Sequence, residues 1–112
     1  LSGYINSQGY NLFEDTKGSY LSGTMVGNIL GENPLLGPLQ LKDGVTATHS
    51  FSSLSSPAHN RGNPNGCMNH LGIPLQTDQR GHERSQHGRC DIGAFEADYN
   101  DITMIPVYLL LL

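Results

Sequence analysis

The sequence has no tryptophan and few charged residues, and these shortages limit the class of protein that it can encode. Charged side chains make up 14% of the 112 residues, against about 25% in an average globular protein. Alanine, glutamate and lysine, which favour helices, are also scarce. The polar surface must therefore come from asparagine, serine, threonine and glutamine. This composition favours a loop-rich, extracellular β protein, and the length suffices for one domain.

The chain also lacks an excess of positive charge and a long apolar segment. Its 6 basic and 10 acidic residues give a net charge of −4, so no basic field exists to attract nucleic acid or an anionic membrane. The apolar C-terminal run is about half of the ~20 residues that a membrane helix needs, and Pro106 interrupts it. We expect no membrane-spanning segment. Leu1 does not open a signal peptide, so we expect any secretion signal to lie upstream in a longer protein.

Signatures of enzymes and of dedicated metal sites are missing from the sequence. It contains no Gly-x-Ser-x-Gly elbow and no EF-hand or nonapeptide calcium loop. The serines from Ser50 to Ser56 are interpreted as a solvated loop, and Glu14 and Asp15 as solvated carboxylates. We predict that the chain is not an enzyme and has no catalytic residue, cofactor or metal.

Short β-prone runs separated by turn residues predict strands of only a few residues each. Two such runs cover residues 10–13 and 20–26, and Gly-Tyr occurs twice near the start of the chain. This pattern fits the turns of a coil. Residues 33–41 carry two prolines among leucines, which oppose helix and central-strand pairing. They predict an extended apolar corner that packs against the core.

Two further strands are predicted in the second half of the chain. Residues 45–48 follow a polar turn, and residues 91–96 alternate loosely between polar and apolar side chains. Alternation in the second segment places Ile92 and Ala94 on one side and Phe95 on the other.

The two cysteines, Cys67 and Cys90, allow three interpretations. A small β domain in an oxidising compartment usually pairs its cysteines, which favours a disulfide across a polar loop. The neighbours His70 and His87 give Cys-x2-His and His-x2-Cys spacings that would suit tetrahedral zinc. Free thiols are the third alternative. We favour the disulfide.

Arginines and aspartates gather between the cysteines and just beyond them. Arg80 and Arg84 stand four residues apart, with Asp78 and Asp91 near them in sequence. Such a group could bind a carbohydrate or an anion. We favour a structural ion-pair network of Asp78, Arg80, Arg84 and Asp91, in which bidentate contacts fix a long loop to the body.

Five short motifs occur in a fixed order along the chain. They are Asn33-Pro34-Leu35-Leu36-Gly37-Pro38-Leu39-Gln40, Thr46-x-Thr48-His49, Ser56-Pro57-Ala58, Thr77-Asp78-Gln79-Arg80-Gly81, and Arg89-Cys90-Asp91-Ile92-Gly93-Ala94-Phe95-Glu96. This succession resembles the C-terminal part of bacterial secreted right-handed parallel β-helix proteins, the group called choice-of-anchor Q domain proteins. His59 and Arg61 depart from its pattern, because small or apolar residues are usual there.

The resemblance implies an all-β fold made of the terminal rungs of a right-handed parallel β-helix and a disulfide-tied capping loop. The β-helix end and cap would cover residues 1–98, with the tied loop over residues 61–90 and an apolar tail over residues 99–112. The group also resembles this chain in having cysteines at the positions of Cys67 and Cys90, without the flanking histidines. It has no established common activity, and no catalytic residue can be carried over.

We therefore expect a non-catalytic structural or adhesive protein, extracellular or at the cell surface, with surface carbohydrate or copies of itself as partners. An exposed rung edge is a template for another strand. The apolar tail could add such a strand head-to-tail and build filaments; its assembly residues would be Ile105, Val107, Tyr108 and Leu109. The alternative is the non-catalytic end of a carbohydrate-active β-helix enzyme, similar to a polysaccharide lyase.

Overall fold

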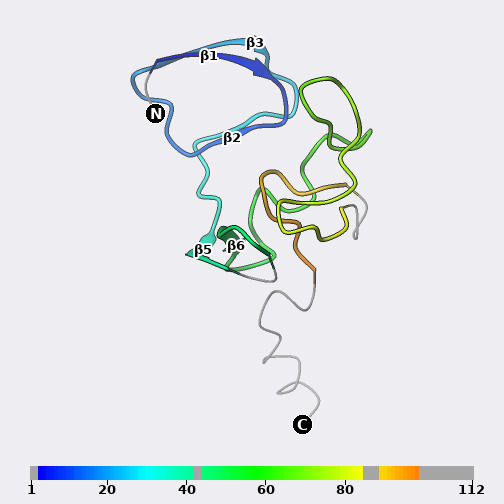
Figure 1. The fold of residues 1–112 in the computed structure, drawn as a ribbon. Helices are drawn as coiled ribbons and strands as arrows, with labels where there is room; N and C mark the ends of the chain where they lie inside the picture. The colour runs from blue at the N-terminus through cyan, green and yellow to red at the C-terminus, as the bar shows by residue number, and fades with distance from the viewer. Residues whose placement is uncertain (1–2, 42–43, 85–88, 99–112) are drawn as a thin grey trace.

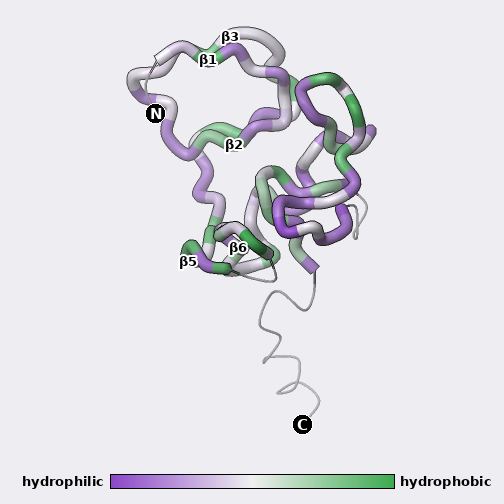
Figure 2. The backbone as a smooth tube through the Cα atoms, in the orientation of Figure 1, coloured by the Kyte–Doolittle hydropathy of each residue, from purple (hydrophilic) through white to green (hydrophobic). Residues whose placement is uncertain are grey.

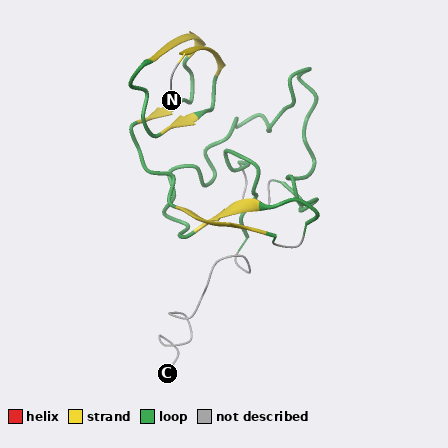
Figure 3. Cartoon of the chain, turned by 60° about the vertical axis from the view of Figure 1, so that its left-hand side comes forward, coloured by secondary structure: helices red, strands yellow, loops and turns green. Residues whose placement is uncertain are grey.

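The computed structural model describes residues 3–41, 44–84 and 89–98, and these fold entirely as strands, turns and loops (Figures 1 and 3). They form six short strands in three two-stranded sheets, which confirms the all-β class. No helix with the length and apolar character of a bilayer crossing occurs in this part of the chain.

The first part of the chain makes two turns that lie on one another. Strand β1 (Gly3–Gln8) pairs in parallel with β3 (Ser19–Thr24), and β2 (Leu12–Phe13) pairs in parallel with β4 (Ile29–Leu30). Figure 1 shows both pairs on opposite sides of one ring of chain. The register sets Gly3 opposite Ser19 and Leu12 opposite Ile29, so successive turns are 16 to 17 residues apart. The β-prone runs 10–13 and 20–26 thus contain strands, although shorter ones than predicted.

A ladder of amides joins the two turns at one corner. Asn11 and Asn28 lie 17 residues apart, and the Asn11 backbone N–H donates to Asn28 Oδ1 at 2.9 Å. The buried Ser7 Oγ accepts from the Gly9 N–H at 3.0 Å, from Asn11 Nδ2 at 3.1 Å and from Asn28 Nδ2 at 2.8 Å. These bonds satisfy the polar groups of the corner and join the two turns.

Only part of the segment 33–41 forms a strand, and the predicted packing of this segment against the core is wrong. Strand β5 (Leu36–Gln40) pairs antiparallel with β6 (Thr48–Phe51), with an irregular register between Leu36 and Leu39, where Pro38 cannot donate to the ladder. Leu36 and Leu39 are 48% and 60% exposed, so the strand contributes little to the core. The strand predicted over residues 45–48 begins only at its last residue.

A small core lies under β6 and the last described residues. Its buried members are Phe51, Ala58, Phe95 and Ala97, and Leu12, Leu54 and Ile92 pack against them. The Phe51 and Phe95 rings meet edge to face, with their centroids 6.2 Å apart. Figure 2 shows hydrophobic residues in β2 and β5, and hydrophilic residues in the connection after β4.

The closing strand predicted over residues 91–96 does not form. This segment bends, and Gly93 has a φ of 110°, a backbone conformation that residues other than glycine rarely adopt. Ile92 and Phe95 therefore reach the same core while Ala94 is exposed, which contradicts the predicted alternation. The physical reason is that carboxylates, instead of a neighbouring strand, accept the backbone N–H groups of Asp91, Glu96 and Ala97.

Candidate functional site

The disulfide between Cys67 and Cys90 closes the loop that the sequence predicted. The two Cα atoms lie 6.1 Å apart, and 23 residues separate them in sequence. Within the loop, Met68 and Pro74 form an antiparallel bridge, and the Leu75 N–H donates to the Cys67 carbonyl at 2.8 Å. Zinc binding through Cys67 and Cys90 is wrong, because both sulfurs are bonded to each other. His87 lies outside the described residues.

Gly62 makes the disulfide possible at this position. A Cβ on Gly62 would lie 2.7 Å from the Cys90 carbonyl oxygen and 3.0 Å from Cys67 Sγ, closer than side chains tolerate. Its N–H donates to the Cys90 carbonyl at 2.8 Å, and its carbonyl accepts from Arg89 Nε at 2.8 Å. The backbone of Gly62 therefore packs directly on the crosslink.

Asp78 is the first of two buried carboxylates that join distant segments. Its Oδ1 accepts from the N–H groups of Arg80 at 2.8 Å and His82 at 3.0 Å, which fixes the turn 78–82. Its Oδ2 accepts from the Glu96 N–H at 2.8 Å and from Arg80 Nε and Nη2 at 3.0 and 2.8 Å. One carboxylate thus holds the turn, the arginine and the end of the described chain together.

Arg80 is buried between a charge and an aromatic ring. Its Nη2 also donates to the Glu96 carbonyl at 2.8 Å, and its Cζ lies 3.6 Å from the centroid of Phe95. The Arg80 and Asp78 side chains have no solvent exposure. Two guanidinium nitrogens of Arg80 donate to the same Asp78 oxygen, Oδ2, and the pair is desolvated, so its geometry is fixed from several sides.

Asp91 is the second carboxylate hub. Its Oδ1 accepts from the Asn60 N–H at 2.7 Å and lies 3.1 Å from His59 Nδ1, and its Oδ2 accepts from the Ala97 N–H at 2.7 Å. The Asn60 residue adopts a φ of 55°, which asparagine tolerates better than most residues. Asp91 therefore ties the turn around residue 60 to the end of the core.

Arg84 pairs with Glu96, which the sequence analysis did not include in the network. Arg84 Nη1 lies 3.2 Å from Glu96 Oε1, whereas it meets Asp91 only at the backbone carbonyl, at 3.3 Å. Its Nη2 donates to the Gly93 carbonyl at 2.8 Å. The structure thus brings Asp78 to Arg80, and places Arg84 beside Asp91 without an ion pair of their side chains. The predicted network did not include Glu96. A strand pattern over residues 91–96 does not indicate that the Glu96 carboxylate turns back to accept from the Asp91 N–H.

The carboxylates of Asp78 and Glu96 have pKa values shifted in opposite directions. Burial disfavours ionisation of Asp78, but the hydrogen bonds from the Glu96 N–H, the Arg80 side chain and the His82 N–H outweigh it, so its pKa is lowered. Burial raises the pKa of Glu96. The Asp91 N–H and Arg84 oppose that rise, and the Asp91 charge adds to it. Glu96 Oε2 is buried and has no hydrogen-bond partner in the described structure.

This arrangement suits support of the backbone better than acid–base chemistry. Asp78 and Asp91 accept hydrogen bonds from backbone N–H groups of segments that they connect, and both are buried. Within residues 3–41, 44–84 and 89–98, no three His, Cys, Asp or Glu side chains gather as metal ligands.

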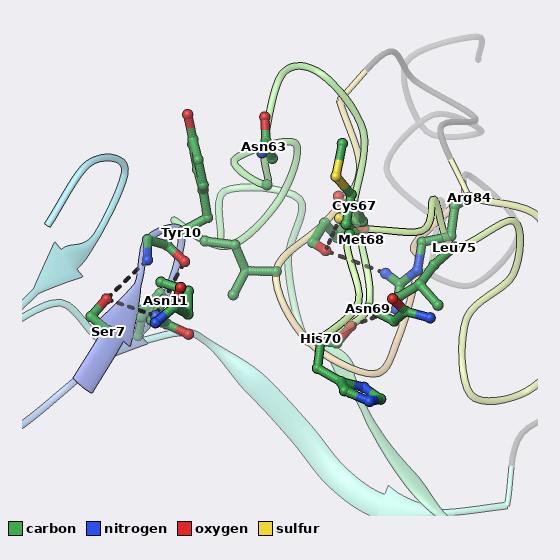
Figure 4. A pocket seen from close by; sticks show the side chains of 18 of the residues that line it. Ser7, Tyr10, Asn11, Asn63, Cys67, Met68, Asn69, His70, Leu75 and Arg84 are labelled. Atoms are coloured by element: carbon green, nitrogen blue, oxygen red, sulfur yellow. Dashed lines mark hydrogen bonds between the residues drawn. The ribbon is translucent and has the colours of Figure 1, made fainter. Parts of the chain in front are cut away.

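A cleft of about 940 Å³ separates the first turn of the coil from the disulfide-tied loop (Figure 4). Figure 4 shows Ser7 and Asn11 on the coil side and Met68, Asn69 and His70 on the loop side. The Asn11 side-chain amide donates a hydrogen bond to Ser7 Oγ, and Asn69 Oδ1 accepts hydrogen bonds from the Leu71 and Ile73 N–H groups. Arg84 and Asp91 also line the cleft, and both are held by the contacts given above.

The predicted assembly residues Ile105, Val107, Tyr108 and Leu109 lie outside the described residues.

Comparisons of the chain with protein-family models, with curated proteins and with solved structures found no significant match.

Proposed function

We propose that the chain is a non-catalytic, extracellular structural and adhesive protein that ends a right-handed parallel β-helix. The observation that carries this proposal is the stacking of β1 on β3 and of β2 on β4 at an offset of 16 to 17 residues. Parallel strands that repeat at a short, regular spacing are typical of coils that bury one stripe of side chains inside. The motif order that resembles choice-of-anchor Q domain proteins supports the same interpretation.

The second half of the chain acts as the cap of this coil in our proposal. A coil with so small a core gains little from apolar burial, and crosslinks then supply stability. The cap has the Cys67–Cys90 disulfide and the carboxylate hubs Asp78 and Asp91. A disulfide of this kind persists in oxidising compartments, which favours a location outside the cell.

The open strand edges of the coil favour further copies of this chain as its partners. Among the described residues, β3 pairs with β1 alone, so its other edge is open to a further strand. Addition of a strand there, from the tail of a second copy, would join subunits head-to-tail.

A turnover screen tests the non-catalytic character. Purified, oxidised protein is incubated with pectate, alginate and aryl esters, beside an Asp91→Asn variant and a blank preparation. We expect no turnover above the blank for either protein. Turnover above the blank by the wild-type chain would overturn the proposal, whether or not the Asp91→Asn variant keeps it, and it would favour the carbohydrate-active enzyme instead.

A further inference from the structure

The outer face of the β1–β3 pair carries an ordered grid of uncharged side chains. Every second residue of β1 from Tyr4 is exposed, and so are Tyr20, Ser22 and Thr24 of β3. The register then sets the outward residues opposite one another in three rows: Tyr4 with Tyr20, Asn6 with Ser22, and Gln8 with Thr24. These rows extend about 13 Å along the strands, since each residue rises about 3.3 Å.

The two tyrosines form the aromatic end of this grid. Their ring centroids lie 5.8 Å apart, and the planes are tilted by 59°. Tyr4 is 91% exposed and Tyr20 is 63% exposed, so the pair lies on the surface. Cross-strand contact between the rings stabilises the strand pair, but it does not cover the outer faces of the rings. Exposed aromatic rings with a polar tip are common in binding surfaces because they bury much area at little entropic cost.

The other four residues supply hydrogen-bonding groups and no charge. In the described structure, the amides of Asn6 and Gln8 and the hydroxyl of Thr24 have no hydrogen-bond partner, and Ser22 Oγ donates to the Ile5 carbonyl at 3.3 Å. Amides and hydroxyls both donate and accept. The face therefore offers two kinds of contact side by side: aromatic rings for stacking and neutral polar groups for hydrogen bonds.

We infer that the β1–β3 face binds a neutral polysaccharide. A sugar ring presents C–H groups on its face and hydroxyls at its rim, which match the tyrosine rings and the amide and hydroxyl rows. An acidic polysaccharide fits less well, because the grid contains no cation and the chain has a net charge of −4. An apolar protein segment would leave the Asn6 and Gln8 amides buried without partners.

The strand pair holds the grid rigid, because β1 and β3 are joined in register over six residues. A preorganised face loses little conformational entropy on binding. This inference deepens the adhesive role proposed above and rests on it.

Calorimetric titration of the full chain with cellohexaose, mannohexaose and xylohexaose tests the inference, with hexagalacturonate as the acidic probe. We expect at least one neutral probe to bind and hexagalacturonate to bind more weakly. Tyr4→Ala and Tyr20→Ala should each weaken binding roughly two- to tenfold, and the double variant should lose it. Tyr4→Phe should retain it, because the ring is kept. Val45→Ala, at an exposed residue outside the grid, is the matched control and should bind as the wild type does.

The inference is overturned if no neutral probe binds at millimolar concentration, if the double variant binds as well as the wild type, or if Val45→Ala weakens binding as much as Tyr4→Ala. Circular dichroism of the variants checks that they fold, and both tyrosines are exposed enough for replacement to be tolerated. Binding without turnover would support both proposals. Turnover of a probe would overturn the non-catalytic role, whereas absence of both binding and turnover would overturn only the tyrosine face.

Discussion

The guanidinium carbon of Arg80 lies 3.6 Å from the centroid of the Phe95 ring, and two nitrogens of the same guanidinium group donate hydrogen bonds to Asp78. Arg80 therefore contributes both a charge to Asp78 and a flat surface to the core. This double contact explains how a charged side chain can be buried beside Phe95, which is 2% exposed.

Replacement of Arg80 should destabilise the cap strongly. We expect Arg80→Leu to lower the free energy of unfolding by about 3–5 kcal/mol, because it leaves the Asp78 carboxylate buried without its cation. Arg80→Lys should cost less, since it keeps the charge but loses the fork and the stacking. Urea denaturation measures both, and exposed Arg61→Leu is the control, with a change within about 0.5 kcal/mol. A loss below about 1 kcal/mol for Arg80→Leu would mean that Arg80 is not part of the structural support.

The opposite pKa shifts of Asp78 and Glu96 predict a stability maximum on the acid side. The raised pKa of Glu96 means that its contribution is fully present below the usual value of 4.5 and is lost as pH rises through the folded pKa. The lowered pKa of Asp78 gives a contribution that is present above 3.8 and is lost as pH falls through the folded value. Stability should thus rise as pH falls toward 4.5, and drop below 3.8.

The variant Glu96→Gln isolates the first of these two limbs. It removes the rise on acidification but keeps the loss at low pH, because Asp78 is untouched. Unfolding free energies of wild type, Glu96→Gln and exposed Glu14→Gln, measured from neutral to acid pH, decide the matter. A constant difference between wild type and Glu96→Gln at all pH values would contradict the prediction.

The close approach of Gly62 to the disulfide predicts that Gly62→Ala prevents normal crosslinking. The added methyl group would meet the Cys90 carbonyl and Cys67 Sγ. We expect the variant to lose roughly the 3 kcal/mol that a bond across 23 residues contributes, and to hold more free thiol when purified without reductant. Thiol titration and denaturation measure both effects, with exposed Asn65→Ala on the same loop as the control. Full oxidation of Gly62→Ala at wild-type stability would exclude this role for Gly62.

The amide ladder predicts a local effect of Ser7→Ala. The substitution removes the acceptor of three N–H groups, from Gly9, Asn11 and Asn28. We expect a loss of about 1 kcal/mol, the net contribution of a hydrogen bond, because the donors are partly buried and Asn11 Nδ2 still has the Gly9 carbonyl as an acceptor. Hydrogen exchange should become faster at Ile29, whose N–H donates to the Asn11 carbonyl. Ser55→Ala, at an exposed position, should change neither quantity. Unchanged exchange at Ile29 in Ser7→Ala would show that the ladder does not hold the two turns together.

The assembly prediction concerns the C-terminal tail. Deletion of residues 105–112 should abolish self-association while the β signal in circular dichroism is kept, because strand addition needs the tail but the fold of residues 3–98 does not. Light scattering across a concentration series measures the assembly. A full chain that is monomeric at high concentration, or a truncated chain that assembles equally well, removes the hypothesis.

Local patterns in the sequence predicted the strands of the coil better than those of the cap. Short β-prone runs around Tyr10 and Tyr20 indicate strands because their side chains favour β structure and glycines separate them. The offset itself was also present in the sequence, since Asn11 precedes Leu12 as Asn28 precedes Ile29. The disulfide was predicted from composition and cysteine count, and the structure confirms it.

The cap depends on contacts that no local pattern contains. Residues 91–96 have the composition of a strand, yet the N–H groups of Asp91, Glu96 and the adjoining Ala97 donate to the carboxylates of Glu96, Asp78 and Asp91 in turn. Whether a carboxylate or a strand satisfies these groups depends on how residues from distant parts of the chain pack, which periodicity does not encode. The same reason explains why the predicted network lacks Glu96, the residue that pairs with Arg84.

The parallel stacking of the two turns carries the proposed fold and function, and nuclear Overhauser contacts in the oxidised chain test this stacking most directly. Side-chain contacts should link Tyr4 with Tyr20 and Leu12 with Ile29, which the parallel register sets opposite each other. An antiparallel hairpin would instead bring the end of β1 near the start of β3, Gln8 near Ser19. Contacts of the first kind, at both pairs, are the result that we predict. Contacts of the second kind, or none between β1 and β3, would contradict the β-helix and the function proposed from it.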